Sequence, residues 1–217
     1  TAPTVTSVST PASGPLVAGE TVTFTLAASE TLSGAGGGSL SLDIGGATAT
    51  ATFDSFSGGN AVYSYTIQPG DTDANGLAVT GVNAPAGALR DAAGNDLDPS
   101  FGGQTFASAT VDADAPGVTG VSGPTVTALN GATMTLTLAA SEDLVDPGGA
   151  APSLSLDVAG SAETASFTGI DGNGDALFTY TVSGTPQDLD GIAVTGASGL
   201  GDLEDAAGNA LSQGGFS

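Results

Sequence analysis

The chain has 217 residues, with 23 Asp and Glu side chains against a single basic one, Arg90, and a formal net charge of −22. It contains no His, Cys, Lys or Trp. These absences exclude Ser-His-Asp and Cys-His catalysis, Schiff-base chemistry, and zinc or copper sites with their usual ligands. The charge argues against nucleic acid and anionic lipid as partners. No apolar run is long enough for direct insertion into a membrane.

Seven strands are predicted in the first half of the chain. In chain order they are residues 5–9, 21–28, 39–44, 48–53, 61–67, 77–82 and 105–111. In the second strand Val22, Phe24 and Leu26 alternate with threonines, which gives one buried face and one solvated face. No segment has a sustained helical period, and Gly, Pro, Asn and Asp separate the short strands. This pattern predicts an all-β protein with the architecture of an immunoglobulin-like β-sandwich.

The second half of the chain repeats the first. Four of the repeated segments are residues 26–30 (LAASE) and 138–142, 39–43 (SLSLD) and 153–157, 76–81 (GLAVTG) and 191–196 (GIAVTG), and 91–95 (DAAGN) and 205–209. This tandem duplication predicts two immunoglobulin-like β-sandwich domains of about seven strands each, residues 1–113 and 114–217. The second stops shortly after its DAAGN loop, so we expect it to lack most of its last strand. Either the chain is a piece of a longer array, or a neighbouring chain donates that strand.

Carboxylates gather near the predicted junction of the two domains. In a seven-strand sandwich, the loops after the second, fourth and sixth strands lie at the end where the first strand enters. Three stretches should therefore meet there, and their oxygens are the ligands that Ca²⁺ collects about six to eight at a time. They carry Asp112 and Asp114 on the linker, Glu142 and Asp143 after the second strand, and Asp205 and Asn209 in the DAAGN loop.

The chain has no Lys to pair with these acids, so we expect a bound cation rather than a set of solvated turns. The first domain carries an equivalent set without the acids of an incoming linker, and we expect a weaker site there. Its members are Glu30, Asp91 and Asn95.

A second acidic segment lies between the fifth and sixth predicted strands. Asp71, Asp73, Asn75 and Gly76 reproduce the D-x-D-x-N-G opening of an EF-hand loop, but no helices flank them and no Glu stands at the twelfth position. The segment is either a further cation site or a turn, and the second repeat keeps Asp188 and Asp190 at the equivalent places. Residues 171–175 (DGNGD) are a third such alternation, for which an Asn-Gly hairpin turn is an adequate explanation and a cation site is the alternative.

The linker Asp112-Ala113-Asp114-Ala115-Pro116, the Ser-Glu pair after the second strand and the DAAGN loop resemble the bacterial immunoglobulin-like repeats of large surface adhesins, including those of RTX type. The resemblance covers both repeats. It implies many copies in the parent protein, export to the bacterial cell surface, and Ca²⁺ that rigidifies the domain junctions. Residues carried over by motif are Asp112, Asp114, Glu142, Asp205 and Asn209. The glycine-rich nonapeptide repeats of that family are absent, so only its extender region is implied.

The leading hypothesis is therefore an extracellular spacer, stiffened by Ca²⁺, whose partners are neighbouring repeats of the same chain. The alternative is a subunit of a self-assembling filament or surface layer, in which identical chains are joined by calcium and strand donation. Binding of a glycan or of ice through Thr-rich faces such as residues 47–52 is a third hypothesis, with few aromatic residues to support it. We expect no enzymatic activity, because these acids sit in exposed loops rather than in a concave pocket.

Overall fold

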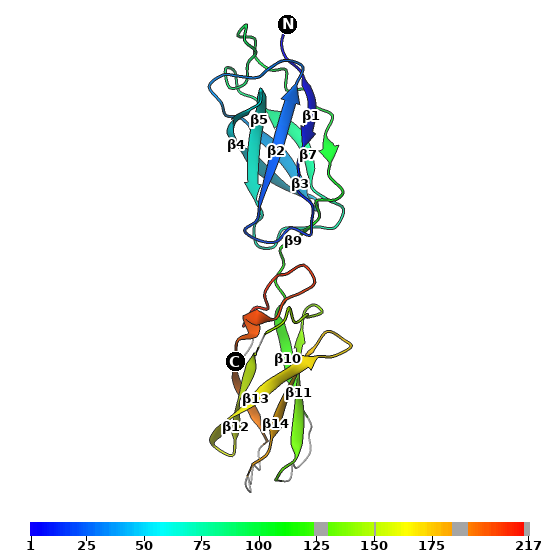
Figure 1. Cartoon of the computed structure of the whole chain (residues 1–217), viewed down its shortest axis with the longest axis vertical. Helices are drawn as coiled ribbons and strands as arrows, with labels where there is room; N and C mark the ends of the chain where they lie inside the picture. Colours follow the sequence, from blue (N-terminus) through cyan, green and yellow to red (C-terminus); the bar gives the residue numbers. More distant parts are fainter. Residues whose placement is uncertain (124–129, 150, 184–190, 215–217) are drawn as a thin grey trace. The chain divides into compact units, whose positions relative to one another are not determined.

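The computed structural model describes residues 1–123, 130–149, 151–183 and 191–214 (Figure 1). The chain forms two compact units, Thr1–Asp114 (unit 1) and Ala115–Ser217 (unit 2). Each is built on antiparallel β-strands, which confirms the predicted all-β class with two β-sheet domains. No helix in the described residues is long and apolar enough to cross a membrane.

Unit 1 contains a seven-stranded sheet in the order β1-β2-β5-β4-β3-β7-β8 and a small second sheet in which β6 pairs with β9. All these pairs are antiparallel. The strands are β1 (Val5–Ser9), β2 (Thr21–Ala28), β3 (Ser39–Ile44), β4 (Ala47–Ser57), β5 (Asn60–Thr66), β6 (Thr72–Asp73), β7 (Ala78–Asn83), β8 (Gln104–Thr105) and β9 (Val111–Asp112).

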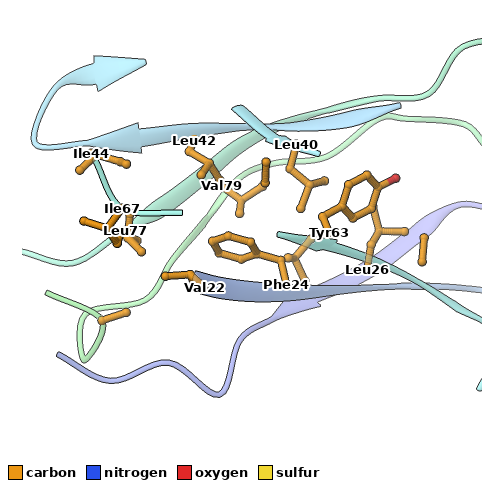
Figure 2. Close-up of a cluster of buried hydrophobic side chains, with 14 of the residues drawn as sticks. Val22, Phe24, Leu26, Leu40, Leu42, Ile44, Tyr63, Ile67, Leu77 and Val79 are labelled. Atoms are coloured by element: carbon orange, nitrogen blue, oxygen red, sulfur yellow. The ribbon is translucent and has the colours of Figure 1, made fainter. Parts of the chain in front are cut away.

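The long sheet folds into two layers because β4 belongs to both. Its first half pairs with β3 and its second half with β5, and a register shift in the second half marks a bulge. Side chains from β2 and β5 meet those from β3 and β7 across the core, as Figure 2 shows for Phe24, Tyr63, Leu40 and Val79. These four side chains are completely buried. Unit 1 is therefore a β-sandwich whose outer faces carry hydroxyl-bearing side chains.

Two predicted strands of unit 1 differ from the structure by more than one residue at an end. The fourth was predicted as residues 48–53, but β4 continues to Ser57 because its second half completes the other layer. The prediction of one last strand over residues 105–111 was wrong, since the segment divides into β8 and β9. A turn closed by the Ala109 amide on the Phe106 carbonyl (2.9 Å) separates them, and β8 pairs with β7 whereas β9 pairs with β6.

Unit 2 repeats this plan in a six-stranded sheet of order β10-β11-β14-β13-β12-β15. Its core is centred on Leu138, Leu154, Leu156 and Phe178. No strand in the described part of unit 2 pairs with the other side of β15, the counterpart of β7. The elements are β10 (Val118–Ser122), β11 (Thr133–Ala140), β12 (Ser153–Val158), β13 (Ser161–Ile170), β14 (Ala176–Thr181), β15 (Ala193–Ser198) and the 3₁₀ helix η1 (Leu200–Asp202).

Candidate metal centre

Within unit 1, the incoming chain, the turn after β2 and the loop after β7 lie together. The hydroxyl of Thr1 lies 3.5 Å from Glu30 Oε1, and Asn95 Nδ2 donates to the Thr1 carbonyl at 3.3 Å. The turn after β2 is also tied to the DAAGN loop by the paired backbones of Ser33 and Arg90, with both N–H···O distances at 2.7 Å. Three stretches that are distant in sequence therefore form one end of this sandwich.

The DAAGN loop of unit 1 is closed by its own first residue. Asp91 accepts from the Asn95 amide at 2.8 Å through Oδ1 and from Asn95 Nδ2 at 2.7 Å through Oδ2. Hydrogen bonds from the side chain of Asn95, and then from its backbone, lower the pKa of Asp91 below its ordinary value. Gly94 has a φ of 88°, the left-handed conformation that glycine adopts without strain. Asn95 therefore acts in this loop as a donor that holds the carboxylate of Asp91.

The DAAGN loop of unit 2 has the same construction. Asp205 is buried, and its Oδ1 accepts from the amides of Ala207 and Gly208 at 2.8 Å and of Asn209 at 2.9 Å. Its Oδ2 accepts from Asn209 Nδ2, also at 2.9 Å. These four hydrogen bonds therefore fix the orientation of the Asp205 carboxylate without the help of a cation.

Glu142 and Asp205 bring two carboxylates together at the end of unit 2. Each offers an oxygen within 4.8 Å of the other, with Glu142 half-buried and Asp205 buried. Two oxygens that bind the same Ca²⁺ at about 2.3–2.6 Å lie at most about 5 Å apart, so this separation suits a shared cation. The pair could hold a metal ion, and oxygen donors of this kind suit a hard divalent one.

The linker acids belong to unit 1. Asp112 lies in β9, where its amide donates to the Leu16 carbonyl at 3.0 Å and its side chain is half-buried; Asp114 is exposed. Asp143 is exposed as well, and its side chain lies over Gly174, at the β13–β14 turn. Asp143 is therefore directed at a hairpin, whereas Glu142 faces the DAAGN loop.

The segment that resembles an EF-hand opening uses its carboxylates to brace loops. Asp71 Oδ2 accepts from the Tyr65 hydroxyl at 2.7 Å and from the Gln68 amide at 2.8 Å. Asp73 is buried and accepts from the amides of Gly45 (2.8 Å), Asn75 (3.1 Å) and Gly76 (2.9 Å). The predicted counterparts Asp188 and Asp190 lie outside the described residues.

Residues 171–175 form a hairpin turn between β13 and β14. Asp171 Oδ1 accepts from the amides of Asn173 at 2.8 Å and Asp175 at 3.1 Å. These two backbone hydrogen bonds, that from Asp175 foremost, lower the pKa of Asp171. The turn needs no cation to explain its geometry.

One charged position near the DAAGN loops escaped the sequence reasoning. Arg90 precedes Asp91 in unit 1 and pairs with Asp96 at 2.7 Å, while Glu204 precedes Asp205 in unit 2. Aligning the two repeats on DAAGN reveals this reversal of charge directly. Asp96 corresponds to Ala210, so this stretch of unit 2 has the same number of acids as that of unit 1 but no base to pair with them.

No protein-family model and no curated protein sequence matches the chain. Among solved structures, 23 chains match. The chain is similar to FdeC, an adhesin of Escherichia coli, with a TM-score of 0.43 and 19% sequence identity in an alignment that covers 96% of this chain. The alignment covers 63% of the FdeC chain, so this protein spans less than two thirds of that structure's length.

Proposed function

We propose that the chain is a pair of spacer repeats from a bacterial cell-surface adhesin, in which Ca²⁺ binds where the linker enters a repeat and stiffens that junction. The observation that carries the proposal is the approach of Glu142 and Asp205 to within 4.8 Å in a chain without Lys. Asp112 and Asp114 of the linker are the proposed further ligands, with the Asn209 side chain holding Asp205 in place. Unit 1 is proposed to bind more weakly through Glu30 and Asp91.

Repulsion between the carboxylates explains why a bound cation would change the junction. Two carboxylate oxygens within 4.8 Å of one another repel by about 1 kcal/mol or more in water and by about 3 kcal/mol or more at the effective dielectric of a protein surface. Each linker acid brought to the same place adds a similar unfavourable contribution, so without a cation the linker is pushed away. A divalent ion reverses the sign of these interactions and holds the linker against the loop.

The test is calcium titration calorimetry of the full chain, with thermal unfolding and small-angle scattering in EDTA and in millimolar calcium. We expect calcium to raise Tm and to lengthen and stiffen the particle. Asp112→Asn and Glu142→Gln should weaken binding by about tenfold or more, since each removes one anionic ligand from the site. Asp205 is a poorer choice, because its carboxylate also accepts four hydrogen bonds within its own loop.

A matched control is Glu163→Gln, which removes the same charge from β13, in the middle of the sheet. This variant should bind calcium as the wild type does. Equal weakening in all three variants would mean that only the net charge matters, and no calcium response in the wild type would refute the proposal.

A second candidate is a self-assembling extracellular filament or surface layer. It is favoured by the edge of β15, with which no strand in the described part of unit 2 pairs. The edge carries no Lys, Asp, Glu or Pro, which are residues that natural proteins place on exposed edges to prevent association. Sedimentation velocity at increasing concentration, with calcium present, separates the candidates, because a spacer stays monomeric.

A further inference from the structure

The linker residues before Asp114 are built into unit 1. Val111 and Asp112 form β9, which pairs with Asp73 and Thr72 of β6. Val111 is buried, and its neighbour Asp112 donates its amide to the Leu16 carbonyl at 3.0 Å. The backbone of Asp112 is therefore held from both sides, by β6 and by the loop that contains Leu16.

Ala113 is held by a different loop. Its amide donates to the Asp71 carbonyl at 2.9 Å, and its carbonyl accepts from the Gly70 amide at 2.8 Å. The side chain of Ala113 is buried as well. Both backbone polar groups of Ala113 therefore bind the turn at residues 68–71. The backbone of the linker is thus restrained up to and including Ala113.

Two side-chain contacts hold that turn to β5, and one of them is the hydrogen bond from Gln68 Nε2 to the Thr66 carbonyl at 2.6 Å. The Tyr65 hydroxyl in β5 donates to Asp71 Oδ2 at 2.7 Å, and the same oxygen accepts from the Gln68 amide at 2.8 Å. Tyr65 pairs with Val22 of β2, so its backbone belongs to the rigid sandwich. Burial, and then the contact with Asp71, raise the pKa of Tyr65 to about 12, so its hydroxyl remains a donor at neutral pH.

We infer that Tyr65 and Asp71 are positioning residues, which fix the turn that grips Ala113 and so hold the carboxylate of Asp112 in place for a cation. The inference rests on the proposed function for the cation alone; the restraint on the linker stands on unit 1 by itself. It also gives Asp71 a role other than metal ligand, since one of its oxygens is committed to Tyr65 and Gln68.

Chain connectivity explains why this brace, the hydrogen bond between Tyr65 and Asp71, affects the cation site. Asp112 precedes the unit boundary by only two residues, so any motion of residues 111–113 displaces its carboxylate directly. A ligand whose backbone is already ordered loses less conformational entropy when it binds, and binds more tightly. Removing the brace should therefore weaken calcium binding without removing any ligand.

The experiment compares Tyr65→Phe with Tyr63→Phe in the full chain. Both changes delete one hydroxyl from β5, but the Tyr63 hydroxyl makes no hydrogen bond in the part of the chain that the structure describes. Amide hydrogen exchange of Gly70 and Ala113 is measured by NMR in EDTA, and the calcium dissociation constant by calorimetry. For Tyr65→Phe we expect exchange about three to ten times faster and a dissociation constant raised about three- to tenfold, as the loss of one charge-assisted hydrogen bond implies. Tyr63→Phe should not speed the exchange of either amide, and it should leave the dissociation constant unchanged.

Unchanged exchange in Tyr65→Phe would overturn the inference whatever calcium does. Faster exchange with wild-type calcium affinity would also overturn it, because the restraint would then have no bearing on the ligand. If the wild type binds no calcium, the proposed function fails together with the role of the brace in binding, while faster exchange would still support the restraint of the linker. Should Tyr65→Phe not fold, Asp71→Ala removes the acceptor of the same contact and is tested with the same readouts.

Discussion

Tyr63 lies in the centre of unit 1 with a hydroxyl that has no hydrogen-bond partner among the described residues. The side chain is completely buried, its ring packs edge-on against Phe53 with centroids 5.7 Å apart, and its hydroxyl makes no hydrogen bond to any described residue. The equivalent residue in unit 2 is Phe178, which is equally buried and packs against Phe167 at the same centroid distance. The second repeat thus shows that the position accepts a ring without a hydroxyl.

We predict that Tyr63→Phe stabilises unit 1. A buried hydroxyl without a partner costs about 1–3 kcal/mol relative to water, and the ring and its contacts are retained. Some of that gain is lost to the small cavity left by the oxygen, so we expect a net increase of about 1 kcal/mol in the free energy of unfolding. For a domain of this size, 1 kcal/mol corresponds to a rise in Tm of about 4–8 °C.

Calorimetric and denaturant unfolding of the full chain measure this change, with Phe178→Tyr in unit 2 as the reverse substitution. We expect Phe178→Tyr to destabilise unit 2 by a similar or larger amount, and the denaturant m value to stay constant in both variants. A loss of stability in Tyr63→Phe would refute the reasoning, because it would mean that the hydroxyl has a favourable partner, such as an ordered water.

The pH dependence provides an independent check. Burial raises the pKa of Tyr63 to about 12, above its ordinary value of 10.0 in the unfolded chain. The folded state therefore binds the proton more tightly, so the contribution of this group to stability is complete below pH 10 and is lost as the pH rises toward 12. Between these values Tyr63→Phe should lose less stability than the wild type.

Three further predictions concern substitutions at single positions and the stability of the chain at acidic pH. Ala159→Gly should stabilise unit 2 by about 0.5–1 kcal/mol in thermal unfolding, since Ala159 has a φ of 53° where unit 1 has Gly45. The matched Gly45→Ala should be strongly destabilising, because its Cβ would lie 2.1 Å from a backbone carbonyl oxygen. A loss of stability in Gly45→Ala no larger than the gain in Ala159→Gly would contradict this. Asp73→Asn should destabilise unit 1 by about 2–3 kcal/mol in EDTA, as it turns an amide group toward backbone donors, and a penalty seen only with calcium would indicate a metal ligand instead. Below about pH 4 the chain should lose stability in thermal scans, because folding lowers the pKa of several carboxyls beneath the unfolded value of 3.8 and that contribution disappears as they protonate; a flat profile between pH 6 and 2 would exclude it. They are Asp91, Asp96, Asp98 and Asp171.

The duplication and most strands could be predicted from local pattern. Residues 5–9, 21–28 and 39–44 were predicted with the bounds that β1, β2 and β3 have, because alternation of apolar and hydroxyl residues is a property of the strand itself. The grouping of the unit 1 loops at one end followed from strand order alone. These inferences need only the period of two and the up-and-down course of successive antiparallel strands.

The tertiary structure decided the features that depend on partners from elsewhere in the chain. The apolar pattern of residues 105–111 reads as one strand, yet the segment divides because β7 and β6, which belong to different sheets, each pair with one end of it. The D-x-D-x-N-G motif was compatible with a metal loop or a turn until the donors around it were known. Those donors include Tyr65 for Asp71 and Gly45 for Asp73, and neither can be read from the motif.

The sequence by itself therefore determined the class of fold, the repeat and the lack of His, Cys and Lys side chains, because these depend on composition and short-range period. Only the tertiary structure decided which carboxylates brace loops and which approach one another. A carboxylate is committed by the donors that surround it, and Asp73 and Asp205 receive theirs from backbone amides whose positions the fold sets. Glu142 meets Asp205 because antiparallel strands return the chain to the same end of the sandwich, across more than sixty intervening residues.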